Sequence, residues 1–133
     1  MGGLPARGQL MIASVGVSLA VLFYAALGLA ALARPRRLLA DFGIVVGGRD
    51  GCNEIRAVYG GFPLAVAGLL LLAQFGSTNL RDGILLSPAV ATLGMAVGRV
   101  ISAIIDGGIG RYPAVFIGIE VLLSLCIAIG LFS

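Results

Sequence analysis

The run that decides the fold is LMIASVGVSLAVLFYAALGLAALA, residues 10–33, in which no charged side chain interrupts the apolar residues. A helix of about 20 residues crosses a hydrocarbon core about 30 Å thick, because each residue adds about 1.5 Å. Within a bilayer the backbone has no water to bond, so a helix is the natural form of such a run. The stretch therefore predicts a membrane-spanning helix from about Leu10 to Ala33.

The rest of the chain repeats this pattern. Hydrophobic residues make up 59% of it and charged residues 11%, with a mean hydropathy of +1.10, far from the balance of a soluble domain. We therefore predict an all-α membrane protein, a single four-helix transmembrane bundle over residues 1–133 with short loops. One longer loop, residues 34–56, has an apolar first half that is too short to span. Residues 38–48 are expected to lie along the membrane surface or to tuck back against the bundle. The three further spans are expected at about 57–75, 84–105 and 113–132.

Arginines set the expected orientation. The loops after the first and third apolar runs hold six arginines, whereas the opposite side holds two. The positive-inside rule then places both termini on the outer side and the longer loop in the cytoplasm. Ala31–Ala33 resembles the cleavage site of a secretory signal, but the length of the first run and the arginines after it favour a retained helix. The six arginines of the two loops are Arg34, Arg36, Arg37, Arg49, Arg56 and Arg111, and the two arginines on the opposite side are Arg7 and Arg81.

Two opposite charges lie inside the apolar runs. Arg99 precedes the cytoplasmic end of the third run by six residues, and Glu120 follows the start of the fourth by seven. At about 1.5 Å per residue the two lie at one depth on consecutive antiparallel helices. A lone charge there costs at least about 2.5 kcal/mol, so we expect an ion pair that faces the bundle interior. Ser102 and Asp106 extend the same stripe of the third helix at steps of three and four.

The motif NEIRAVYGGFP, residues 53–63, is expected to arrive at the same end of the bundle. Pro63 predicts a bend, because it removes a backbone hydrogen bond. Glycines on the second and third helices favour close helix packing; they are Gly60, Gly61, Gly68, Gly94 and Gly98. The outer half of the bundle is expected to be almost wholly apolar. The predicted polar cluster, a candidate ligand site or a structural clamp, is Asn53, Glu54, Arg56, Tyr59, Arg99, Ser102, Asp106 and Glu120.

Composition also argues against several chemistries. The chain contains no histidine, which excludes metal or catalytic schemes that need one. Cys52 and Cys126 lie too far apart in sequence for a metal-ligand motif, and nothing indicates a disulfide framework. No basic face interleaved with aromatic residues indicates nucleic acid. We therefore expect no metal, cofactor or nucleic-acid partner.

Two longer patterns carry a resemblance. NEIRAVYGGFPLAVAGLLLL (residues 53–72), GMAVGRVISAIIDG (residues 94–107) and a glutamate in the last apolar run resemble a family of small bacterial membrane proteins known as a domain of unknown function (number four-three-four-five). The resemblance implies a four-helix protein of the bacterial inner membrane with no established activity. It also implies a signature of Asn53, Glu54, Arg56, Tyr59, Gly60, Gly61, Arg99, Asp106, Gly107 and Glu120.

Three classes of function remain open. Small size and glycine-rich helices favour an accessory or scaffold protein, with a membrane-protein partner or a second copy of the chain. The polar cluster beside an apolar bundle also suits a binder of an amphipathic lipid or isoprenoid. An acid-base isomerase is a further form of this class, with Glu54, Asp106 or Glu120 as acid or base and Tyr59 assisting. A proton-coupled exporter is the least favoured, because a glutamate paired with arginine does not readily exchange protons.

Overall fold

The computed structural model describes residues 6–76 and 79–132, and these residues form helices joined by short connections. Within them, four helices are long and apolar enough to cross a membrane, at Arg7–Ala33, Gly48–Phe75, Arg81–Ile105 and Arg111–Ile129. The predicted all-α four-helix architecture is thereby confirmed. The elements are α1 (Ala6–Ala33), α2 (Pro35–Leu38), η1 (Ala40–Phe42), α3 (Gly48–Ile55), η2 (Arg56–Gly61), α4 (Phe62–Phe75), α5 (Arg81–Ile105), α6 (Arg111–Ile129) and η3 (Gly130–Phe132).

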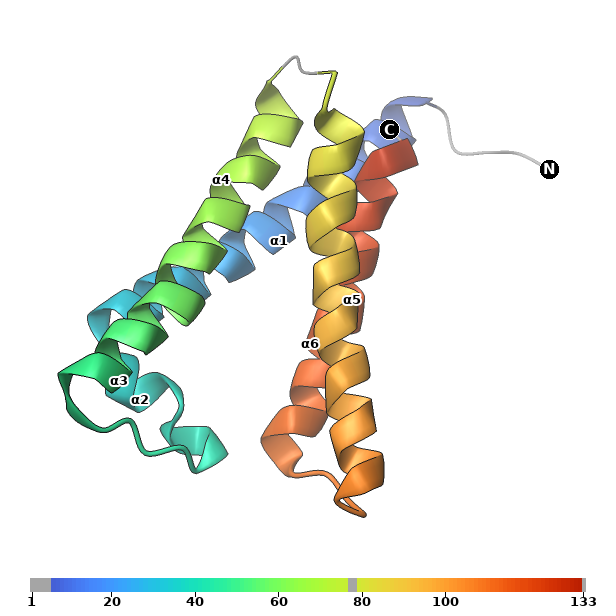
Figure 1. Cartoon of the computed structure of the whole chain (residues 1–133). Coiled ribbons are helices and arrows are strands. Elements are labelled where there is room, and N and C mark those ends of the chain that lie inside the picture. The colour runs from blue at the N-terminus through green and yellow to red at the C-terminus, as the bar shows by residue number, and fades with distance from the viewer. Residues whose placement is uncertain (1–5, 77–78, 133) are drawn as a thin grey trace.

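The long helices form two pairs, α1 with α4 and α5 with α6, and α1 also packs against α6. Figure 1 shows that the pairs lie close together at the end that carries the α4–α5 connection. They diverge toward the opposite end, which carries α2 and the turn between α5 and α6. The space between the pairs is therefore closed at one end by helix packing and bordered at the other by residues 34–47.

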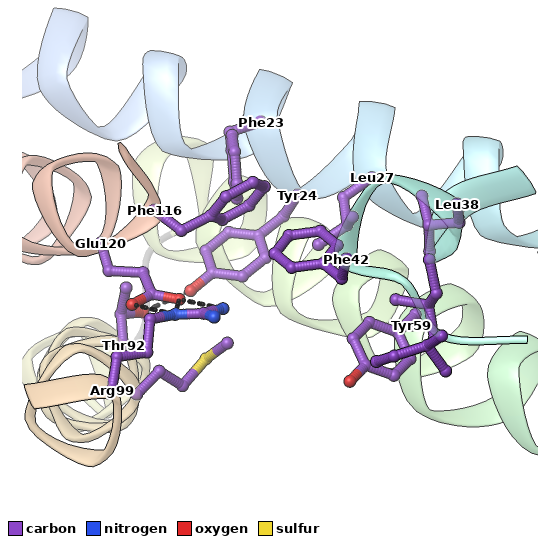
Figure 2. Close-up of a pocket in the computed structure, with 13 residues that line it drawn as sticks. Phe23, Tyr24, Leu27, Leu38, Phe42, Tyr59, Thr92, Arg99, Phe116 and Glu120 are labelled. Atoms are coloured by element: carbon purple, nitrogen blue, oxygen red, sulfur yellow. Dashed lines mark hydrogen bonds and ion pairs between the residues drawn. The ribbon is translucent and has the colours of Figure 1, made fainter. Parts of the chain in front are cut away.

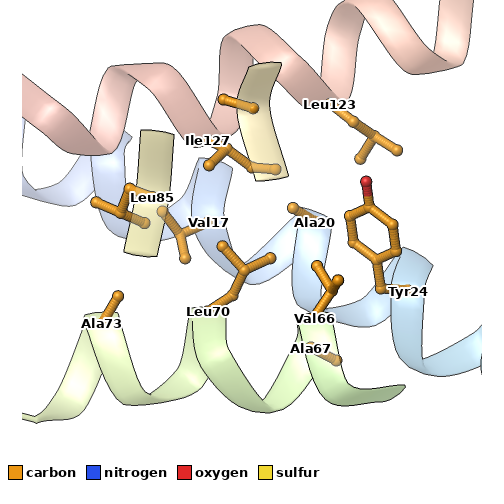
Figure 3. Packing of buried hydrophobic residues seen from close by; sticks show 11 residues of the cluster. Val17, Ala20, Tyr24, Val66, Ala67, Leu70, Ala73, Leu85, Leu123 and Ile127 are labelled. Atoms are coloured by element: carbon orange, nitrogen blue, oxygen red, sulfur yellow. The ribbon is translucent and has the colours of Figure 1, made fainter. Parts of the chain in front are cut away.

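A buried apolar cluster joins the two pairs near their closed end. Leu70, Leu85 and Ile127 are fully buried and come from α4, α5 and α6 (Figure 3). Val17 and Ala20 of α1 lie among them. Many other large apolar side chains point outward and stay exposed, as expected when lipid rather than water surrounds the helices.

Close crossings of α1 depend on glycine. A Cβ atom on Gly16 would lie 2.8 Å from the carbonyl oxygen of Cys126, and one on Gly28 would lie 2.9 Å from that of Gly60. The packing role predicted for Gly60 is therefore present, with Gly28 as its partner. Within the described chain no other helix packs closely on Gly68, Gly94 or Gly98, where an added Cβ would meet no atom within 4 Å. These three face outward, because the bundle packs through other faces of α4 and α5.

The second long helix starts at Gly48, not at about residue 57 as expected. Its first turns, α3, are polar and therefore escape a search for apolar runs, although they continue the same helical rod. A bend was predicted at Pro63, and the structure has the π-helix η2 directly before that residue. There the Phe62 N–H bonds the carbonyl of Ala57, five residues back. Because proline donates no hydrogen bond, a wide turn ahead of it is a physical solution.

Residues 38–44 tuck against the bundle, which was one of the two expected placements. The Phe42 ring lies 5.3 Å from that of Phe116 and 5.9 Å from that of Tyr112, between centroids. Leu39 is buried. This segment therefore covers part of the space between the diverging pairs.

Candidate functional site

A cavity of about 170 Å³ lies between the two helix pairs, where they diverge. Five of its lining residues are aromatic and five are aliphatic, so its wall is mostly apolar, and we call it the aromatic cavity. Its polar lining residues are Thr92, Arg99 and Glu120. The aromatic lining residues are Phe23, Tyr24, Phe42, Tyr59 and Phe116, and the aliphatic ones are Leu27, Leu38, Leu39, Ile44 and Met95 (Figure 2).

The predicted ion pair between Arg99 and Glu120 is present in the wall of this cavity. The Arg99 Nε atom donates to both carboxylate oxygens, at 2.9 and 3.0 Å. The second nitrogen, Nη2, lies 2.9 Å from Oε1. Glu120 is 2% exposed, so its charge is compensated by arginine rather than by water. A buried carboxylate with such a two-point contact is held in one orientation.

An aromatic ring supports the arginine. Phe116, one helical turn before Glu120, has its ring centroid 5.3 Å from the guanidinium carbon of Arg99. A cation over an aromatic face is stabilised by the ring quadrupole. Because Phe116 also contacts Phe42, the ion pair is connected through one ring to the segment that covers the cavity.

A second polar contact joins the helix pairs beside the ion pair. The Thr92 hydroxyl donates to the Pro88 carbonyl at 2.6 Å, and Tyr24 of α1 hydrogen-bonds the Thr92 hydroxyl. Figure 2 shows the Tyr24 hydroxyl directed toward Arg99 and Glu120. In the described chain, every fully buried side-chain nitrogen or oxygen has a hydrogen-bond partner. The fully buried polar atoms of the wall are therefore satisfied by the protein itself.

Tyr59 lies on the opposite wall of the cavity, within η2 (Figure 2). Its ring is half-buried, and its hydroxyl has no hydrogen-bond partner among the described residues. Tyr59, Arg99 and Glu120 are thus the predicted site residues that the fold brings to one cavity.

The other five predicted residues lie elsewhere, so the eight do not form one cluster. Asn53 and Arg56 line a different hollow. Glu54 is exposed on α3. Ser102 donates to Asp106 Oδ2 at 2.9 Å at the exposed end of α5. The helix pairs diverge at this end, which separates α3 from the end of α5.

The hollow that Asn53 and Arg56 line lies where α2 turns back beside α3. It has a volume of about 660 Å³, and we call it the arginine hollow. Its residues are Ala33, Arg34, Pro35, Arg36, Arg37, Arg49, Cys52, Asn53 and Arg56.

Sequence reasoning missed several polar contacts. Thr92 lies seven residues before Arg99 and so on the same face of α5. This spacing could have predicted that Thr92 lies in the same polar site. The expectation of an almost wholly apolar outer half is wrong, because Gln74 of α4 donates to Ser14 and Ser18 of α1, each at 3.0 Å. The sequence prediction considered only charged residues within the apolar runs, whereas uncharged polar side chains such as these also join helices in lipid.

Cys52 and Cys126 are free thiols. In residues 6–76 and 79–132 no group of three or more histidine, cysteine, aspartate or glutamate side chains lies close enough to hold a metal ion.

The fold and the cavity define a class, an all-α bundle of four helices long enough and apolar enough to cross a membrane. A family model described as a domain of unknown function, DUF4345, matches residues 12–131. The chain therefore belongs to the DUF4345 family, as the sequence motifs indicated. No curated protein and no solved structure matches it.

Proposed function

We propose that the aromatic cavity binds an amphipathic ligand, a lipid or isoprenoid with an oxygen-bearing head. The observation that supports this most directly is the lining, in which rings and aliphatic chains surround a single ion pair. An apolar cavity of about 150 Å³ is large enough to hold benzene. The aromatic cavity, at about 170 Å³, is of the size that takes a ring or one isoprene-sized branch.

The head of the ligand would bind at Arg99. Its Nε and Nη2 atoms contact Glu120, and its Nη1 atom has no acceptor in the described chain. Because the ion pair is neutral overall, a carbonyl or hydroxyl oxygen suits this donor better than a free anion. The Tyr59 hydroxyl across the cavity offers a second hydrogen bond.

The tail of the ligand would leave the cavity past Met95 and Ile44. Both line the cavity and both are 49% exposed, so the cavity reaches the outer surface of the bundle there. A hydrocarbon chain that extends from this opening would continue into lipid at no cost in exposure to water.

The arrangement favours binding over proton transfer. Among the three acids considered as acid or base, only Glu120 lines the cavity, and both its oxygens bind Arg99. Glu54 and Asp106 lie outside the cavity. A proton-coupled exporter is disfavoured for the same reason, because the glutamate is already neutralised by its partner.

A matched pair of variants tests the binding proposal. Leu27→Trp would fill the cavity, whereas Leu29→Trp adds the same ring at a position 60% exposed on the same helix. With farnesol as probe, we expect thermal stabilisation of the wild type and of Leu29→Trp, and none of Leu27→Trp. No stabilisation of the wild type by farnesol, and no lipid retained in native mass spectrometry, would contradict the proposal.

A second candidate is an accessory role in a membrane complex, supported by the outward face of α5. Gly94 and Gly98 meet no atom within 4 Å and lie one turn apart, a spacing that admits a closely packed helix of another membrane protein. Gly94→Ile with Gly98→Ile should then release a polypeptide that co-purifies with the wild type. Gly118→Ile, at an equally open position of α6, should retain it. Equal retention by both variants would exclude this face.

We also propose a bacterial inner membrane as the location, with both termini on the outer side, from the arginine-rich loops. A fusion of alkaline phosphatase to the C-terminus should be active, and a fusion of green fluorescent protein should be dark. The reverse pattern would invert the orientation.

A further inference from the structure

The arginine hollow concentrates positive charge beyond what a membrane-facing loop requires. Its wall contains five arginines, from the α1–α2 junction, α2, α3 and η2, and no acidic residue. In the part of the chain that the structure describes, none of the five forms an ion pair with a carboxylate. By contrast, Arg111, the first residue of α6, is not part of the hollow, although α6 begins at the same end of the bundle (Figure 1). The five are Arg34, Arg36, Arg37, Arg49 and Arg56.

The structure fixes the backbone of α2 and the side chain of Arg56 at the hollow. Pro35 is buried at the start of α2 and fixes the backbone that carries Arg36 and Arg37. The Nε atom of Arg56 donates to the carbonyl of Leu32 at 3.0 Å, which leaves its two terminal nitrogens for another acceptor. Asn53 adds an amide one turn before Arg56. For Arg56, part of the side-chain entropy that ligand binding costs has thus already been lost in folding.

Neighbouring arginines repel one another unless an anion lies between them. The planar guanidinium matches the oxygens of a phosphate in pairs of hydrogen bonds. One phosphate monoester carries a charge of about −2 at most, so it neutralises fewer than half of the five arginines. A ligand with two phosphate groups fits the charge better, and a hollow of about 660 Å³ has room for it.

We propose that the arginine hollow is a binding site for a diphosphate, or for the closely spaced phosphates of a lipid headgroup. This site is distinct from the aromatic cavity, and the proposal does not rest on the function proposed for that cavity. The shared chemistry is a dense phosphate anion held by paired guanidinium contacts.

The first arm of the test uses inorganic pyrophosphate. The full chain in phosphatidylcholine nanodiscs is titrated by calorimetry in phosphate-free buffer, with an expected Kd below about 1 mM. Arg36→Gln with Arg49→Gln removes two exposed arginines of the hollow and should weaken binding at least about tenfold. Arg111→Gln removes an arginine at the same end and should leave the Kd within about twofold. If the first double variant does not fold, Arg37→Gln with Arg49→Gln replaces it.

The second arm distinguishes a lipid from a soluble source. The nanodiscs are prepared with dioleoylglycerol diphosphate, a lipid with two adjacent phosphates in its headgroup, as well as phosphatidylcholine, and retained lipid is identified by native mass spectrometry. Selective retention of dioleoylglycerol diphosphate by the wild type, lost in the double variant and kept in Arg111→Gln, assigns the site to a lipid headgroup. Pyrophosphate binding without such retention assigns it to a soluble diphosphate. The proposal is overturned if neither probe binds, or if Arg111→Gln weakens binding as much as the double variant does.

Discussion

Arg99 and Glu120 are 21 residues apart in sequence, and one guanidinium contacts both oxygens of the buried carboxylate. Each residue alone is unfavourable within an apolar helix, and each makes the other tolerable. The contact joins α5 to α6 in the wall of the aromatic cavity. It therefore fixes the packing of that helix pair as well as the polarity of the cavity.

Removal of one partner should cost more than removal of both. Arg99→Ala leaves Glu120 buried without a partner and should lower the free energy of unfolding by about 3 kcal/mol. Arg99→Ala with Glu120→Ala should restore a large part of this loss. Unfolding of the purified protein in mixed micelles measures all three variants. Equal stability of the two single variants and the double variant would show that the contact contributes nothing.

Substitution of Gly28 should disturb the crossing of α1 with η2. A Cβ there would lie 2.6 Å from the Leu64 Cγ atom as well as 2.9 Å from the Gly60 oxygen. Gly28→Ala should therefore destabilise the protein by roughly 1–3 kcal/mol. Gly68→Ala, also within a helix but in open space, should be neutral or stabilising by up to about 1 kcal/mol. A thermal melt of each variant would reveal the difference, and similar melting of the two would count against the close crossing.

The Gln74 contact should stabilise the α1–α4 pair. Gln74→Leu removes its hydrogen bonds to Ser14 and Ser18 and should cost about 1 kcal/mol in a membrane environment. Gln9→Leu, at an exposed position of α1, serves as the control and should change stability by less than about 0.5 kcal/mol. Equilibrium unfolding measures both, and a Gln74→Leu variant as stable as the control would argue that the contact is not formed in the membrane.

Loss of the Phe42 ring should release the segment that covers the aromatic cavity. Its contacts with Tyr112 and Phe116 are each worth about 1 kcal/mol. In Phe42→Ala the amides of residues 38–44 should therefore exchange with solvent deuterium up to about thirtyfold faster. Val45→Ala changes a neighbouring side chain that is 93% exposed and should leave the exchange unaltered. Unchanged exchange in Phe42→Ala would mean that the segment is held by other contacts.

Depth along a helix was enough to predict the ion pair from sequence. Arg99 and Glu120 share a level because a short turn joins the ends of α5 and α6 and helical rise is constant. The four spans were predictable for the same reason, since each is a long apolar run. These features depend on local regularity and on the cost of a lone charge in lipid, both of which can be read from one sequence.

The assembly of the polar residues was not predictable in this way. Asn53 and Arg56 were expected beside Asp106, but the divergence of the helix pairs separates them. That divergence depends on how α1 crosses its neighbours, and therefore on contacts such as Gly16 with the backbone of Cys126. Likewise, the direction in which α2 turns brings Arg36 and Arg49 to one hollow. Contacts between distant segments leave no periodic signal in the residues that make them.

The π-helix η2 has a consequence for chain length. A π-turn holds one more residue than the α-helical turn it replaces, and one residue corresponds to a rotation of about 100°. Removal of a single residue from 56–61 would therefore return η2 to an α-helix and leave α3 and α4 nearly in register. A single deletion within α4 has no wide turn to absorb it, and it would rotate Arg56 by about 100° relative to the apolar residues that follow the deletion. Within this fold, a change of one residue in the length of the second span is therefore tolerated at η2 and not in the regular helix beyond it.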